Sequence, residues 1–163
     1  MNKTPRLVSL TAALVISLFL SASPAWAEGS TPESVVKKFA KAYYMLDESM
    51  ADYLSQDALV NENDVAMVEL FLRLKEENAR NRGYKMSYLQ MHPILLKTTV
   101  LEQTEESAAV RLNTTALRSI NPLYRIVGYL FGLVREHEFE TTLSLVKEDG
   151  VWKVGPGALN PLG

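Results

Sequence analysis

The sequence contains no cysteine, and this absence excludes several classes of function at once. Disulfide bonds, haem attached through cysteine and cysteine-ligated iron–sulfur clusters are all excluded. A bacterial lipoprotein anchor is excluded as well, because its lipid is attached to a cysteine. A domain without such cross-links must obtain its stability from an apolar core, and a chain of 163 residues is long enough to form one.

Histidine is almost as scarce, since His92 and His137 are the only two in the chain. Their separation does not match a known spacing of metal ligands, so we expect neither a metal site nor a bound cofactor. There is no excess of positive charge either, because 17 Lys and Arg stand against 19 Asp and Glu. Nucleic acid is therefore not an expected partner, because it is bound by basic surfaces.

Residues 1–27 have the layout of a secretory signal peptide. Two cations precede an apolar run, Leu7–Leu20, which is shorter than the ~20 residues of a membrane-spanning helix. Ala25 and Ala27 suit a cleavage site, so we expect cleavage after Ala27 and a periplasmic or secreted protein; the alternative is an uncleaved N-terminal anchor. Residues 28–163 are then expected to form one domain.

Helical patterns dominate the first half of this domain. Thr31 followed by Pro32 is typical of a helix start, and apolar residues follow at helical spacing. Asp47 and Asp64 are interpreted as the caps of two further helices, and Gly83 as the end of the last one. Its charged final turns, 75–82, are expected to be a solvated face. The predicted elements are a helix over 32–46, a short helix after Asp47, a polar loop over 57–63 and a helix over 64–82.

Alternation with a period of two dominates the second half, which predicts antiparallel strands. It begins at Tyr84, Met86 and Tyr88, and Pro93 then favours an edge strand or a bend. Further strands are expected over 95–102, 108–114, 136–147 and 151–154, with an irregular tail over 155–163. Helices followed by a meander of strands indicate an α+β fold, with the helices packed on one face of a curved sheet.

Two stretches carry a family resemblance: TPESVVKKF (31–39) with YLSQD (53–57), and TLSLVKEDGVWKV (142–154). Together they resemble the small exported proteins of the NTF2-like superfamily, in particular its lumazine-binding-like branch. The resemblance implies a cone-shaped domain with a pocket between the first helix and the sheet, and often a dimer through the open sheet face. Members include ketosteroid isomerase, scytalone dehydratase and many non-enzymatic modules, so the fold leaves the function open.

An apolar insert at about 118–134 departs from the family pattern, as does the length of the third helix. Its residues Leu123, Ile126, Val127, Leu130 and Phe131 share one face of a predicted helix. Three interpretations remain open: a helix or hairpin in the core or over the pocket mouth, an exposed patch for a partner, or a segment in a membrane interface.

The expected pocket lies between the first helix and the inner face of the sheet. On the strand over 136–147, alternation places His137 on the interior face and three glutamates on the other. His137 is the candidate acid or base of an enzyme; the alternative is a partly solvated histidine at a strand end. The residues predicted to line the pocket are Phe39, Tyr43, Met86, Tyr88, His137 and Phe139.

Three functions follow from these observations. The leading hypothesis is an exported, non-enzymatic module that holds an apolar or amphipathic small molecule. The second is an accessory protein that docks on a periplasmic or membrane complex through the 121–134 insert. The third is an isomerase- or dehydratase-like enzyme that uses His137.

Overall fold

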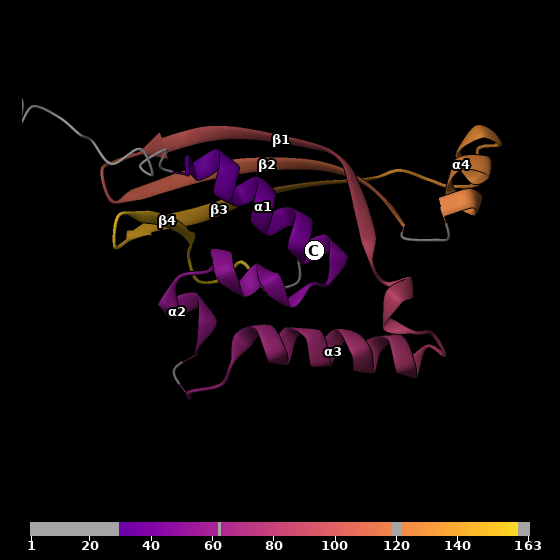
Figure 1. Ribbon diagram of the computed structural model, residues 1–163, viewed down its shortest axis with the longest axis horizontal. Helices are drawn as coiled ribbons and strands as arrows, with labels where there is room; N and C mark the ends of the chain where they lie inside the picture. The colour runs from indigo at the N-terminus through magenta and orange to yellow at the C-terminus, as the bar shows by residue number, and fades with distance from the viewer. Residues whose placement is uncertain (1–29, 62, 119–121, 160–163) are drawn as a thin grey trace, which may run out of the picture.

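The computed structural model describes residues 30–61, 63–118 and 122–159. The predicted signal peptide lies outside these residues. The described part is an α+β domain in which helices pack on one face of a curved antiparallel sheet (Figure 1). The predicted fold class is therefore confirmed, and the arrangement is the one that the NTF2-like resemblance implies. No helix in the described part has the length and apolar character needed to span a membrane.

Helix α1 (Pro32–Met45) begins as the sequence predicts. The Thr31 hydroxyl accepts a hydrogen bond from the Ser34 backbone N–H at 3.3 Å, and proline occupies the first turn. A 3-10 helix, η1 (Glu48–Tyr53), follows with Asp47 as its cap, also as predicted. These caps satisfy backbone donors that would otherwise lack a partner at the helix starts.

The segment between η1 and the next long helix differs from its prediction. The expected polar loop contains a short helix, α2 (Gln56–Leu59), which buries Ala58. Helix α3 (Met67–Asn81) begins three residues later than predicted, because Asp64 lies in a turn and does not cap it. The Asn61 side chain stabilises that turn by accepting hydrogen bonds from the backbone N–H groups of Asn63 and Val65.

The predicted strand over residues 84–88 is wrong. Met86–Tyr88 form a 3-10 helix, η2, after a turn at Gly83 with φ +76°. The rings of Tyr84 and Tyr88 stack with their centroids 4.7 Å apart, so two residues four positions apart share one face. Three alternating apolar residues are too few to distinguish a strand from such a turn.

Four strands form one antiparallel sheet in the order β1-β2-β3-β4. Strand β1 (Met91–Gln103) lies at one edge, in agreement with Pro93, and its register shifts after Pro93 and again after Val100. The other strands are β2 (Ser107–Arg118), β3 (His137–Glu148) and the short β4 (Val151–Val154). Asp149 and Gly150 join β3 to β4 with φ of 49° and 81°, the geometry of a tight hairpin turn.

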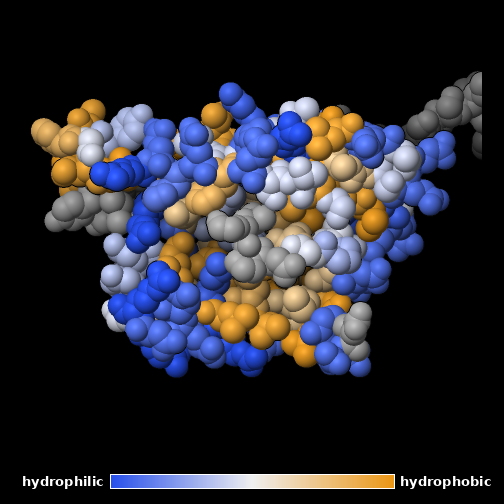
Figure 2. Space-filling view, turned by 180° about the vertical axis from the view of Figure 1, so that it is seen from behind, coloured by the Kyte–Doolittle hydropathy of each residue, from blue (hydrophilic) through white to orange (hydrophobic). Residues whose placement is uncertain are grey.

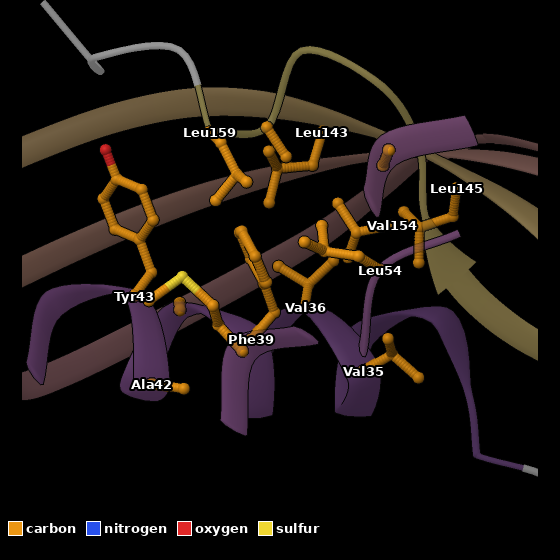
Figure 3. Packing of buried hydrophobic residues seen from close by; sticks show 14 of the residues in the cluster. Val35, Val36, Phe39, Ala42, Tyr43, Leu54, Leu143, Leu145, Val154 and Leu159 are labelled. Carbon is orange, nitrogen blue, oxygen red and sulfur yellow. The ribbon is translucent and has the colours of Figure 1, made fainter. Parts of the chain in front are cut away.

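The core lies between α1 and the concave face of the sheet. Figure 3 shows Val36 and Phe39 pointing from α1 toward Leu143 and Val154 of the strands. Phe39 is 1% exposed and Val36 and Val154 are fully buried. Trp152, in the closing hairpin, is buried as well. Helix α3 lies below α1, on the side away from the sheet (Figure 1), and buries one face including Phe71.

The apolar insert forms helix α4 (Pro122–Leu130), which stands off one end of the sheet between β2 and β3 (Figure 1). The segment is a helix, and of the three interpretations left open, packing in the core is not the one that the structure has. Its described large side chains are exposed: Leu123 by 69%, Ile126 by 61% and Leu130 by 75%. The 3.6-residue period identifies which side chains share a face, and it does not identify what covers that face.

Candidate functional site

A cleft of about 280 Å³ opens where five elements meet. The C-terminal end of α1 and the last turns of α3 form one wall. The chain entering β1, the end of β2 and the start of β3 form the other. Its lining residues are Tyr43, Tyr44, Leu46, Phe71, Lys75, Asn78, Arg82, Leu89, Met91, Arg118 and Phe139. The volume is close to the lower limit for small-molecule sites, so the cleft suits a compact ligand.

The floor of the cleft is aromatic. The ring of Tyr43 lies 5.1 Å from that of Phe71 and 5.5 Å from that of Tyr44, and Tyr44 in turn lies 5.5 Å from Phe139. Such rings present a large apolar surface at little cost in conformational entropy. The floor therefore provides the apolar contact that a hydrophobic ligand requires.

The Tyr44 hydroxyl is a polar group in this apolar floor. It is buried, and the neighbouring Thr114 hydroxyl is buried as well. Burial raises the pKa of Tyr44, and the Thr114 side chain partly opposes this rise. Buried polar groups are usually paired with one another, so the hydroxyl is directed to Thr114, and Tyr44 contributes its ring to the cleft.

The rim of the cleft is positively charged. Lys75, Arg82 and Arg118 all line it, and none of the described aspartates or glutamates does. Lys75 lies 5.1 Å above the ring of Phe71, and the guanidinium of Arg118 lies 4.7 Å from the ring centre of Tyr88. Burial lowers the pKa of Lys75 from its usual value of 10.5. These contacts hold two of the cations beside the apolar floor.

A second hollow, of about 340 Å³, adjoins the cleft along α3. It shares Phe71, Lys75 and Asn78 with the cleft and adds Leu70 and Leu74, of which Leu74 is 53% exposed. Apolar surface therefore continues past Lys75 on the face of α3, which leaves room for a ligand longer than the cleft itself.

The predicted pocket residues fall into three groups. Tyr43 and Phe139 line the cleft. Phe39 lies beneath it in the core, 5.8 Å from Tyr43 between ring centres. Met86 and Tyr88 lie on η2 and do not line the cleft, although Tyr88 contacts Arg118, which does.

His137 begins β3 on the predicted face. The alternation of exposed and covered residues along β3 is confirmed, with the glutamates on the exposed face. The imidazole is half-buried and stacks on Phe139 at 6.3 Å, but it does not line the cleft. In the part of the chain that the structure describes, no carboxylate or hydroxyl forms a hydrogen bond with it. Residues 30–61, 63–118 and 122–159 also contain no group of three potential metal ligands.

Sequence reasoning missed the charged rim. The back of α3 is largely exposed, as predicted, but Lys75, Asn78 and Arg82 also line the cleft. Together with Phe71 they lie at helical spacing, which places them on one side of α3. That spacing is visible in the sequence, whereas the approach of Arg118 from the distant end of β2 is not.

No model of a known protein family matches this sequence, and no curated protein is similar to it. Among solved structures, the chain is similar to a candidate ketosteroid isomerase from Shewanella frigidimarina, with 21% identity and a TM-score of 0.39. The similarity covers 76% of this chain and 90% of the other. A likeness this distant carries no information about activity or substrate.

Proposed function

We propose that this protein is an exported binding module that holds a small amphipathic molecule in the cleft between α1, α3 and the sheet. The observation that carries this proposal is the cleft itself, with its aromatic floor and polar rim. Ligand sites are mainly apolar concavities in which a few polar groups fix the orientation of the ligand.

Replacing Phe139 tests this proposal. Phe139→Ala removes one of the four rings of the aromatic floor. We expect it to weaken binding of the uncharged dye N-phenyl-1-naphthylamine by about tenfold, which corresponds to about 1.4 kcal/mol of binding free energy. Dye fluorescence measures the affinity. Leu101→Ala is the matched control, because Leu101 is exposed on β1 and lies outside the cleft.

Equal dye affinity in the wild type and Phe139→Ala would contradict the proposal. Native mass spectrometry of the protein purified from its own source provides a test without a probe. We expect the wild type to carry a bound molecule that is lost on denaturation. We expect Phe139→Ala not to retain this molecule.

A second candidate function is favoured by α4, namely docking on a protein partner. Leu130, Phe131 and Leu133 are 75%, 74% and 78% exposed, and Figure 2 shows this end of the molecule as an apolar projection. Soluble monomers rarely expose such a contiguous apolar surface. A protein partner fits better than an anionic lipid surface, because Arg125 is the only charged residue between 121 and 134.

Phe131→Asp tests this second function. We expect the variant to lose a stable complex, measured as the mass of the protein purified from its own source. We also expect its free energy of unfolding to stay within about 0.5 kcal/mol of the wild type, because the side chain is exposed. Leu101→Asp is the control at an exposed apolar site on β1. If the wild type instead sediments with lipid vesicles and Phe131→Asp does not, α4 is a membrane contact.

The third hypothesis, an isomerase- or dehydratase-like activity through His137, stays a prediction. His137 stacks on Phe139 near the cleft, but no described acid or hydroxyl is paired with it. A general acid or base acts most effectively when a second group orients it and tunes its pKa. The binding function therefore has the stronger support.

A further inference from the structure

The charge of the cleft contrasts with that of the whole chain. The protein carries a formal net charge of −2, with more acids than bases. The cleft nevertheless gathers Lys75, Arg82 and Arg118 from two separate elements, and its described lining includes no acid. Cations brought together without counter-charges repel one another, which destabilises the empty cleft. A bound anion would offset this repulsion.

These three cations have no carboxylate partner among the described residues. The described ion pairs lie elsewhere: Arg80 with Glu76 at 3.0 Å on α3, and Arg111 with Glu140 at 3.7 Å on the sheet. Arg80 and Glu76 are both more than half exposed, so an ordinary surface pair is available to α3 outside the cleft. Lys75 and Arg118 instead contact aromatic rings, which position them and leave their N–H groups available.

We propose that the molecule held in the cleft is an amphipathic anion, whose acidic group is bound by Lys75, Arg82 and Arg118 while its apolar part lies on the aromatic floor. This inference rests on the proposed binding function and specifies the class of ligand. Arginine binds carboxylate, sulfonate and phosphate groups through paired N–H donors, and such charge-assisted hydrogen bonds are stronger than neutral ones. A bound anion would also stabilise the charged form of Lys75, which burial disfavours.

Two dyes test this inference directly. N-phenyl-1-naphthylamine and 8-anilinonaphthalene-1-sulfonate share one ring system, and only the second carries a sulfonate. We expect the wild type to bind the sulfonate dye at least about tenfold more tightly. Lys75→Met and Arg118→Gln should each remove most of this preference, measured as the ratio of the two dye affinities on the same variant. Arg73→Gln is the matched control, because Arg73 is an exposed cation on α3 that does not line the cleft.

The outcomes separate this inference from the function on which it rests. Equal affinities for the two dyes in the wild type, with the neutral dye still sensitive to Phe139→Ala, would overturn the anionic ligand and keep the binding function. A preference for the sulfonate that Lys75→Met and Arg118→Gln do not change would overturn it too, because the anion would then bind elsewhere. If neither dye responds to Phe139→Ala, the binding function itself is wrong.

Discussion

Phe39→Ala is expected to lower the free energy of unfolding by about 3–5 kcal/mol. The Phe39 ring is 1% exposed and lies between α1 and the strands, with Tyr43 at 5.8 Å (Figure 3). Its removal leaves a cavity that surrounding side chains can fill only in part, so the lost apolar burial and the cavity both contribute. Unfolding in urea, followed by circular dichroism, measures the effect.

Phe131→Ala is the matched control for this experiment. It makes the same chemical change, but Phe131 is 74% exposed at the end of α4. We expect a change within about 0.5 kcal/mol, as for other exposed sites. Equal losses of stability in the two variants would mean that α4 is packed in solution, and would contradict the exposure on which its docking role rests.

Leu112→Asp is expected to have the second large effect. Leu112 is 2% exposed on the inner face of β2, so the new carboxylate would be buried. An uncompensated buried charge costs at least about 3–5 kcal/mol, which is a large share of a typical stability of about 5–15 kcal/mol. Measurable loss of folded protein at pH 7 is the expected result, and Leu112→Asn separates the effect of charge from that of lost apolar contact.

The pH dependence of Leu112→Asp identifies the cause. Desolvation would raise the pKa of Asp at this position above its value in the unfolded chain, so the folded state would bind more protons between the two values. The destabilisation should therefore grow as the pH rises through that window and shrink as the pH falls. Leu112→Asn should show no such difference from the wild type; a parallel response of both variants would show that residue 112 is open to water.

Local signals in the sequence were sufficient for the elements that determine the fold. Thr31 and Pro32 start α1 by satisfying backbone donors within a few residues of chain. Asp149 and Gly150 form the turn before β4, because the two residues adopt positive φ there. The α+β class and the curved sheet follow from such signals, together with the alternation along β3.

The cleft was only partly predictable, because it is assembled from distant segments. Tyr43 and Phe139 were found because each lies on the inner face of an element with a clear period. Arg118 was missed because it reaches the cleft only through the position of the end of β2 relative to α3. A local sequence pattern does not predict the relative position of two elements that are distant in the chain. The exposure of α4 was left open for the same reason, since amphipathic spacing is equal in a buried and a protruding helix.

The interruptions along β1 have a consequence for aggregation. An edge strand offers unpaired backbone groups to any other extended chain, and 13 regular residues would be a long template. Pro93 and the two register shifts divide that template into short pieces. At the opposite edge, β4 has four residues and Val154 already pairs with Leu54. Neither edge therefore offers a long, regular row for strand addition, which protects a protein with an exposed apolar helix from polymerising through its sheet.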